Sequence, residues 1–289
     1  AMLDPEMVRA ARREEVQWLK DFKVYEKVPI AESVGKTFID MRWMDLNKGD
    51  DERPLYRSRL VDRESRKRNP SMKGTLAATP PLEANELLMS LAITEGIGYR
   101  RGKKELGMKL DFIDVRRAYF HARARRPVYV QLPEEDYEYG MCGRLNKSLY
   151  GTRDAAQNWE YEYSEWLESV GLRRGSARPC VFYNAEYDIQ LVVHGDDFLI
   201  CGPADACKTF REYMGSKMIC KHTTIDAENP DVELKVLNRT INWDGDVLHY
   251  EGDRRHAGRI VEVLGLSQAK AGSTPRAKVI GNDDEEDRG

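Results

Sequence analysis

The 289-residue sequence has few cysteines and no long hydrophobic run. Its five cysteines are odd in number and include no C-x-x-C pair, so neither a disulfide scaffold nor a zinc ribbon is expected. No apolar stretch approaches the roughly 18 residues that a membrane-spanning helix needs. No basic start is followed by an apolar segment, so we expect neither a membrane protein nor a signal peptide. A chain of this length can form two ordinary domains or one large, subdivided domain.

The net charge is also small, but it is unevenly distributed. The formal net charge is −3, and the last seven residues, with their run of five acids, contribute −4. Residues 57–73 contain seven basic and two acidic residues, and residues 100–126 contain ten basic and three acidic residues. Each basic tract is either a solvated face or part of a channel that binds phosphates. We expect the acidic tail to be disordered.

Apolar spacing predicts a helix at the start of the chain and a hairpin after it. Asp4-Pro5 can cap a helix whose apolar residues follow at helical spacing, namely Val8, Ala11, Trp18 and Phe22. Residues 37–46 and 55–62 alternate apolar and polar residues, and the turn-forming residues between them favour a long-looped hairpin. This hairpin would carry Arg42, Arg57 and Arg59.

The rest of the chain mixes helices and strands. Apolar spacing predicts a helix marked by Leu87, Leu88, Leu91 and Ala92, and further helices around residues 155–170, 207–218 and 260–264. Residues 110–115 are predicted to form a buried strand, and residues 189–201 a hairpin. A second hairpin would have residues 232–242 and 247–250 as its arms. Because helices and strands do not alternate regularly, the predicted fold class is α+β rather than a doubly wound sheet.

Three carboxylates stand where strands are predicted to end. Asp196 and Asp197 lie at the tip of the 189–201 hairpin, where adjacent negative charges repel, and Asp114 lies at the end of the strand 110–115. If this strand neighbours the hairpin, the three carboxylates meet at one edge of a sheet. Such a set suits Mg²⁺, and two such ions about 4 Å apart can promote phosphoryl transfer. Taken alone, the Asp-Asp pair also fits an ordinary surface turn.

Several segments resemble one known family. Residues 114–120 (DVRRAYF) resemble the first catalytic motif of reverse transcriptases, and residues 193–197 (VHGDD) resemble their paired-aspartate motif. Residues 144–159 (RLNKSLYGTRDAAQNW) resemble the K-S-L-Y-G-L-K-Q-A-P-x-x-W stretch of copia-type LTR retrotransposons. Residues 56–61, 128–131 and 273–275 match further motifs of that class in the same order. The resemblance runs from about Pro5 to Pro275, nearly the whole chain.

The resemblance implies a right-hand polymerase with fingers, palm and a short thumb, in which an antiparallel palm sheet packs on helices. The implied divisions are fingers at 1–77, palm at 78–120, fingers again at 121–154, palm at 155–242, and a partial thumb with the acidic tail at 243–289. A ribonuclease H domain is not expected within this sequence. The resemblance also implies an intracellular location, in a cytoplasmic particle or the nucleus.

Site residues follow from the same resemblance. Asp114, Asp196 and Asp197 would be catalytic and would bind two Mg²⁺ ions, for which Mn²⁺ could substitute. The incoming nucleotide would meet Arg57 and Arg59 at its triphosphate, Tyr119 beneath its sugar, and Tyr150 and Gly151 along its pocket. Primer and template would contact Leu237, Asn238, Arg66 and Arg68. Several positions depart from the family pattern: Asn238 stands where glycine is usual, His194 where tyrosine is usual, and Gly195 where a larger residue is common. Ala156 replaces a proline, and residues 152–154 replace the usual Leu-Lys-Gln.

The predicted function is RNA-directed DNA polymerisation from a primer 3′-hydroxyl, with RNA or DNA template, primer and dNTPs as partners. A domesticated, non-catalytic nucleic-acid-binding protein is the alternative from another class. A metal-dependent nuclease is the third interpretation, because two-metal carboxylate sites also cut phosphodiesters.

Overall fold

The computed structural model describes residues 3–50, 52–62, 77–100, 102–237, 239–252 and 254–270. Helices and strands are mixed, as the α+β prediction requires. None of the helices in these ranges is long and apolar enough to cross a membrane. Arg66 and Arg68, the distal motif 273–275 and the acidic tail lie outside the described residues.

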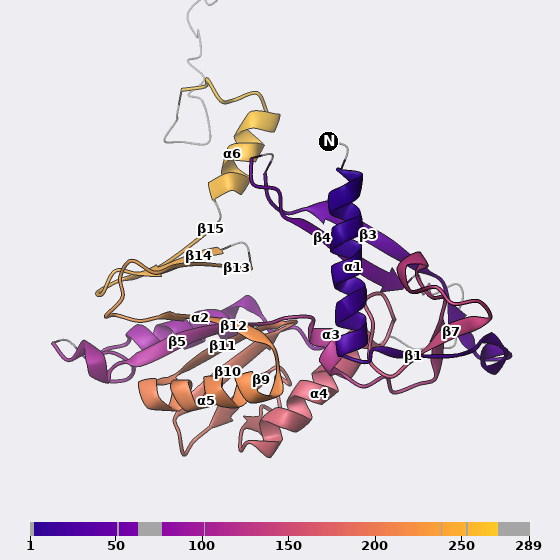
Figure 1. Ribbon diagram of the computed structural model, residues 1–289. Helices are drawn as coiled ribbons and strands as arrows, with labels where there is room; N and C mark the ends of the chain where they lie inside the picture. The colour runs from indigo at the N-terminus through magenta and orange to yellow at the C-terminus, as the bar shows by residue number, and fades with distance from the viewer. Residues whose placement is uncertain are drawn as a thin grey trace, which may run out of the picture.

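A six-stranded sheet forms the base of the molecule (Figure 1), with strand order β12-β5-β11-β10-β9-β8. Its pairings are antiparallel throughout. The strand bounds are Met108–Val115 (β5), Arg173–Arg174 (β8), Val181–Asn184 (β9), Ile189–His194 (β10), Asp197–Pro203 (β11) and Cys220–Ile225 (β12). The pairing of β5 with β11 therefore satisfies the condition that brings Asp114 beside the aspartate hairpin.

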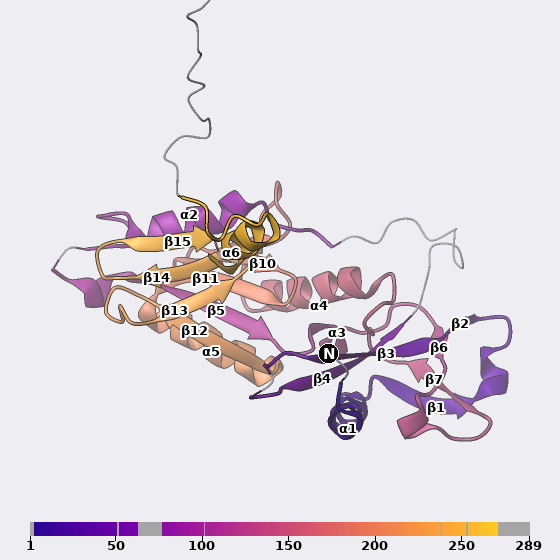
Figure 2. The ribbon, with the colours of Figure 1, turned by 90° about the horizontal axis from the view of Figure 1, so that it is seen from above.

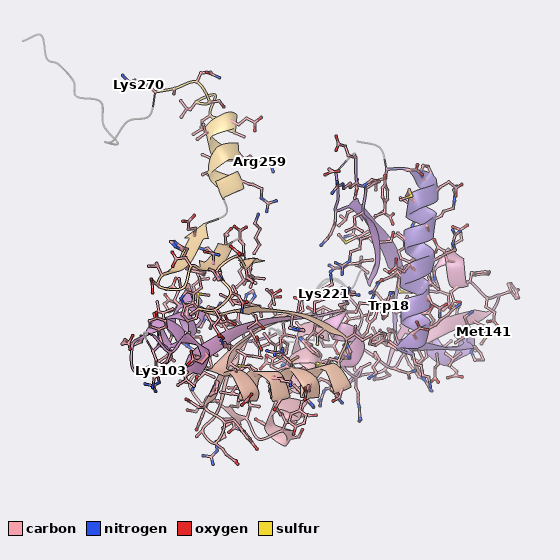
Figure 3. All side chains as sticks on the ribbon, turned by 60° about the vertical axis from the view of Figure 1, so that its left-hand side comes forward. Trp18, Lys103, Met141, Lys221, Arg259 and Lys270 are labelled. Atoms are coloured by element: carbon pink, nitrogen blue, oxygen red, sulfur yellow. The ribbon has the colours of Figure 1, made fainter. Side chains whose placement is uncertain are left out.

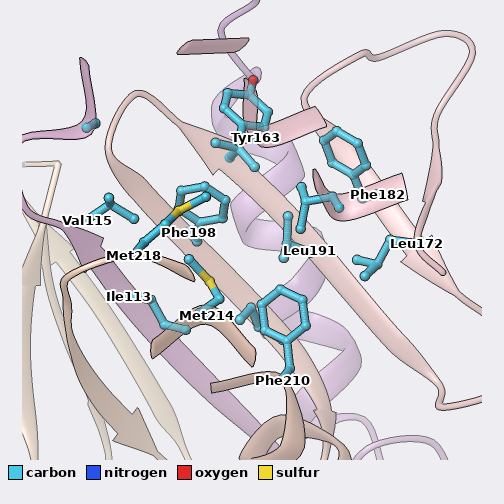
Figure 4. Close-up of a cluster of buried hydrophobic side chains, with 14 of the residues drawn as sticks. Ile113, Val115, Tyr163, Leu172, Phe182, Leu191, Phe198, Phe210, Met214 and Met218 are labelled. Atoms are coloured by element: carbon cyan, nitrogen blue, oxygen red, sulfur yellow. The ribbon is translucent and has the colours of Figure 1, made fainter. Parts of the chain in front are cut away.

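Each face of this sheet is covered by its own hydrophobic core. On one face, α4 (Ala155–Ser169) and α5 (Ala204–Lys217) pack on side chains such as Ile113, Leu191 and Phe198, as Figure 4 shows. On the other face, α2 (Leu82–Ile93) packs with Leu110, Phe112 and Leu199. Strand side chains alternate between the faces. A sheet buried on both sides is a rigid platform for residues at its edge.

A second region carries the N-terminal part of the chain. Strands β1 (Tyr25–Pro29), β7 (Met141–Leu145), β6 (Val128–Val130) and β2 (Thr37–Ile39) form a four-stranded sheet in that order. Strands β3 (Met41–Asn47) and β4 (Tyr56–Asp62) form a separate two-stranded hairpin. Helix α1 (Pro5–Asp21) begins at Asp4, whose side chain accepts hydrogen bonds from two backbone N–H groups of the first turn. It packs against β4, and Figure 2, which views the helix nearly end-on, shows it beside the β3–β4 hairpin.

A third region lies opposite α1. Strands β13 (Glu233–Val236), β14 (Arg239–Trp243) and β15 (Leu248–Gly252) form a three-stranded sheet, from which α6 (Arg254–Val263) projects. In Figure 3, Arg259 on α6 and Trp18 on α1 lie on two separate arms, with Lys221 on the base between them. The described part of the chain thus has two arms rising from the six-stranded sheet.

Most predicted elements are confirmed, and three details are wrong. The predicted strand 37–46 is two strands, since β2 pairs with β6 while β3 pairs with β4. Residues 232–242 are not one arm of a hairpin, because the chain reverses between β13 and β14 around Leu237. Leu87 does not face the core. It is 57% exposed, whereas Met89 is buried. Helix α2 is therefore rotated about its own axis relative to the apolar face that the sequence predicts.

Candidate active site

The hairpin between β10 and β11 turns in two residues, Gly195 and Asp196, since His194 pairs with Asp197. Gly195 has φ +67°, the left-handed region that glycine adopts without a Cβ penalty. A Cβ at this position would meet no other atom within 4 Å, so backbone conformation rather than space favours glycine. The Trp159 indole N–H, from α4, donates a 2.8 Å hydrogen bond to the Gly195 carbonyl oxygen. This hydrogen bond from α4 therefore stabilises the turn that contains Asp196.

The carboxylates predicted to act together form an acidic wall, which we define as Asp114, Asp196 and Asp197. Asp114 and Asp197 are directly opposite each other in the β5–β11 register, so their side chains share one face of the sheet. Asp196 lies in the turn itself, and all three carboxylates line one cleft. The wall stands at the end of the six-stranded sheet, on the face that also carries Phe112 and Leu199.

The electrostatics of the acidic wall reflect uncompensated negative charge. Burial, together with the charges of Asp196 and Asp114, raises the pKa of Asp197 to about 6. Burial and the charge of Asp196 raise the pKa of Asp114 as well, although Arg57 and Lys221 oppose that shift. A carboxylate whose pKa is raised by acidic neighbours lies within electrostatic reach of them and lacks sufficient positive charge nearby.

The predicted arginines form a basic wall, which we define as Arg57 and Arg59 on β4. They are two residues apart on one strand and therefore share a face. Both line a cleft of about 510 Å³ together with Asp114, Asp196 and Asp197. Burial and the charge of Arg59 lower the pKa of Arg57. The structure thus brings two guanidinium groups and three carboxylates to one cleft, from regions of the chain far apart in sequence.

Three further predicted residues gather beside the basic wall. Tyr119 lies in the short helix α3 (Ala118–His121), and its ring centroid is 5.0 Å from that of Tyr150. The Arg59 guanidinium carbon lies 4.9 Å from the Tyr150 ring centroid, a cation–π distance. Burial raises the pKa of Tyr150 to about 12, so its hydroxyl stays protonated near neutral pH. Gly151 follows with φ +94°.

Of the residues predicted to contact primer and template, the structure describes Leu237, which does not line this cleft. Leu237, with φ +48°, lines a separate cavity of about 280 Å³ between the six-stranded sheet and the β13–β14 hairpin. Asp114 and Asp197 also line that cavity. Asn238, like Arg66 and Arg68, lies outside the described residues.

Sequence reasoning missed several residues that line the cleft. Lys221 on β12 lies opposite Asp114 in register and lines the cleft, but β12 itself was not predicted because its apolar alternation is weak. Arg117 also lines the cleft and is held by Glu15 of α1. An acid inside a helix carries no sign of a partner 102 residues away. Arg117 could have been suspected, since it closely follows the strand that carries Asp114.

The donor set of the acidic wall suits a hard divalent cation. Carboxylate oxygens are the ligands that Mg²⁺ takes, and the raised pKa values of Asp114 and Asp197 show that added positive charge would be favourable there. Within the ranges that the structure describes, no three His, Cys, Asp or Glu side chains form a closed ligand cluster. The three carboxylates therefore suit magnesium by their chemistry and by their common place in one cleft.

Comparison with known proteins connects this geometry to a family. A family model described as "Reverse transcriptase (RNA-dependent DNA polymerase)" matches residues 22–275. The Retrovirus-related Pol polyprotein from transposon TNT 1-94 of Nicotiana tabacum is 25% identical over 201 residues, which cover 66% of this chain and 14% of that protein. The Transposon Ty1-OR Gag-Pol polyprotein of Saccharomyces cerevisiae is 23% identical over 198 residues, covering 65% and 11%. The chain thus spans a small part of these polyproteins.

Among solved structures, the apo telomerase from Candida tropicalis, truncated from its C-terminal domain, superposes with a TM-score of 0.45. Its sequence identity is 10%, and the match covers 84% of this chain and 60% of that chain. The telomerase from Candida albicans in complex with a fragment of telomeric RNA also has a TM-score of 0.45, at 9% identity, covering 83% and 49%.

Proposed function

The chain belongs to the reverse transcriptase (RNA-dependent DNA polymerase) family, and we propose that it extends a primer 3′-hydroxyl with dNTPs on an RNA or DNA template. The observation that carries this proposal is the single cleft that joins the acidic wall to the basic wall. Transfer of a nucleotidyl group requires that the attacking hydroxyl be activated and that triphosphate charge be neutralised. Opposed carboxylates and guanidinium groups supply the two requirements from opposite sides.

We assign the roles residue by residue. Asp114 and Asp196 would hold Mg²⁺ most directly, with Asp197 supporting at the edge, and Mn²⁺ could substitute. Bound magnesium would supply charge neutralisation at the reacting phosphate and a lower pKa for the primer hydroxyl. Asp114 and Asp197 would hold the reacting groups in fixed positions, because the strands that carry them, β5 and β11, pair in one sheet.

The nucleotide would lie between the two walls. Arg57 and Arg59 would bind its triphosphate, for which a guanidinium fork is well matched. Tyr119, held against Tyr150, would pack on the deoxyribose and exclude a 2′-hydroxyl by contact. Gly151 would allow the backbone to approach the nucleotide closely. Leu237, Asn238, Arg66 and Arg68 would contact primer and template.

The three regions of the fold support a hand-like division. The four-stranded sheet, α1 and the β3–β4 hairpin correspond to proposed fingers at 1–77 and 121–154. The six-stranded sheet with its helices corresponds to the proposed palm at 78–120 and 155–242, and α6 to a partial thumb at 243–289. Strands β14 and β15 pair across the last boundary, so the thumb would begin within the three-stranded sheet.

Primer extension tests the proposal. A labelled DNA primer annealed to RNA or to DNA of the same sequence is incubated with dNTPs and Mg²⁺, Mn²⁺ or EDTA. Extension on RNA with either metal, and none in EDTA, is the expected result. Duplex binding without extension under every condition would instead favour the non-catalytic nucleic-acid-binding protein. Shortening of the strand without dNTPs would favour the nuclease.

A further inference from the structure

Helix α1 precedes the segment that matches the family model, which begins at residue 22, yet it borders the proposed active site. Ala11 and Glu14 on this helix line the cleft between the two walls. Glu15, the next residue, is only 2% exposed. A buried carboxylate is costly unless it is paired and hydrogen-bonded, so Glu15 requires a partner.

The partner of Glu15 is Arg117. The Arg117 Nη2 and Nε atoms donate to Glu15 Oε2 at 2.8 and 3.1 Å, and both side chains are largely buried. The same guanidinium lies 4.3 Å from the ring centroid of Trp18, one turn further along α1. Helix α1 therefore holds the Arg117 side chain through two interactions, an ion pair with Glu15 and a cation–π contact with Trp18.

Arg117 is held in a conformation that L-residues rarely adopt. Its φ and ψ are +51° and +49°, in the left-handed region, where the Cβ of an L-residue crowds the following carbonyl oxygen. Strain of this kind persists only where surrounding contacts enforce it, and it concentrates at functional sites. Here the enforcing contacts come from α1.

The position of Arg117 in the chain shows which part of the site these two interactions affect. The residue lies in the turn that joins β5 to α3, three residues after Asp114 and two before Tyr119. Other contacts tie the beginning of the turn: Val115 N–H donates to the Asp196 carbonyl at 2.9 Å, and Arg116 N–H to the Ile219 carbonyl at 2.8 Å. At Arg117 itself, the side chain is fixed from α1.

We propose that Glu15 is a positioning residue of the active site: through Arg117 it sets the turn that spaces Asp114 from Tyr119. The inference rests on the proposed polymerase function. Glu15 also attracts Arg57 and Arg59 electrostatically, so its negative charge limits repulsion among three guanidinium groups around one cleft. Losing the charge would displace the groups that meet the incoming nucleotide, while surfaces that meet the primer–template duplex would be unaffected.

The test compares Glu15→Gln with Glu6→Gln, a change on the same helix whose ion pair with Arg9 is exposed to solvent. Single-nucleotide incorporation gives KM and kcat for a dNTP, and a separate titration gives Kd for primer–template. We expect about a tenfold higher dNTP KM for Glu15→Gln, since small misplacements in an active site are costly. Kd for primer–template should change less than twofold, and Glu6→Gln should match the wild type throughout.

A second measurement separates positioning from simple structural support. Glu15→Gln leaves a buried arginine unpaired, which is destabilising in itself. The dNTP KM is therefore also measured at a temperature well below the Tm of this variant, where the variant is fully folded. If Glu15 only supports the fold, the KM at that temperature matches the wild type, and the proposal is overturned. If Glu15 positions the turn, the dNTP KM stays raised.

Two further results keep the test decisive. If Glu15→Gln does not fold, Arg117→Lys replaces it, because lysine keeps the charge but loses the two-pronged geometry. A wild-type KM in either folded variant overturns the inference. Failure of the wild-type chain and of Glu6→Gln to extend any primer, by contrast, refutes the polymerase proposal itself and leaves a different signature.

Discussion

The acidic wall of the cleft rests on a six-stranded sheet, whereas the basic wall rests on a two-stranded one. Strands β5 and β11 are covered on both faces by hydrophobic cores. The β3–β4 hairpin has no further strand on either side within the described residues. It is supported by α1, because Arg12 of α1 forms an ion pair with Asp45 of β3 at 2.7 Å. The Ser58 hydroxyl of β4 donates a hydrogen bond to the same carboxylate. Carboxylates that share metal ions need fixed geometry, while a wall that admits and releases nucleotides can be more loosely held.

The largest effect is expected from the acidic wall. If Asp114 binds the metal as proposed, Asp114→Asn should reduce primer extension by about 10³-fold, because losing a metal ligand costs several kcal/mol of transition-state stabilisation. Its Tm should not fall, since burial and the charge of Asp196 disfavour the carboxylate at this position. Extension rates and thermal melts measure both quantities, with the exposed Asp231→Asn as a control. Extension near the wild-type rate would show that the acidic wall is misassigned.

The second prediction concerns the support of the basic wall. Arg12→Ala removes a partly buried ion pair with Asp45, so local opening of β3–β4 should become easier by about 2 kcal/mol. Hydrogen exchange should accelerate across residues 41–62 and stay unchanged in β5 and β11. Arg9→Ala, which breaks an exposed pair on the same helix, is the control. Equal acceleration in both sheets would contradict the contrast between the walls.

The third prediction uses the titration of Asp197, whose pKa is raised to about 6 by burial and by its two acidic neighbours. An unfolded aspartate titrates near 3.9, so the folded chain binds more protons between about pH 4 and 6. Stability should therefore fall as pH rises through this interval, and the destabilisation is complete above pH 6.

Asp197→Asn removes that destabilisation. At pH 7.5 in EDTA its Tm should exceed that of the wild type by about 2–4 °C, the shift expected for roughly 1 kcal/mol in a chain of this size. The difference should shrink as pH falls toward 4, and also on adding Mg²⁺, which would neutralise the wild-type carboxylates. A lower Tm for Asp197→Asn at pH 7.5 would argue that the acidic wall is already compensated.

The two walls also differ in how far the sequence predicted them. The buried strand 110–115 and the two-residue turn after His194 are local patterns, so the meeting of Asp114 with Asp197 required only that two strands be neighbours. Arg57 and Arg59 were placed on a hairpin by alternation, and that hairpin is confirmed. Their positions opposite the aspartates came from family resemblance, because no local pattern fixes how a hairpin packs on a distant sheet.

What the sequence did not predict are contacts between segments far apart. The pairing of Glu15 with Arg117 spans 102 residues, and neither residue belongs to a spacing pattern that would link them. The left-handed backbone at Arg117 was equally hidden, since turn preferences favour glycine or asparagine there. Gly195 is a different case: the sequence marked it only as a departure from the family pattern, and the structure supplies a reason for glycine in the left-handed backbone of the hairpin turn.

The smallest effect is expected from the hydrogen bond by which α4 stabilises the turn of the acidic wall. Trp159→Phe removes the hydrogen bond to the Gly195 carbonyl but keeps an aromatic ring near Tyr163 and Phe198. One lost hydrogen bond is worth about 1 kcal/mol, so extension should slow by about fivefold. Trp166→Phe, on the same helix but packed on Phe210, is the matched control. Equal losses in the two variants would mean that general packing, rather than the bond to the turn, sustains the acidic wall.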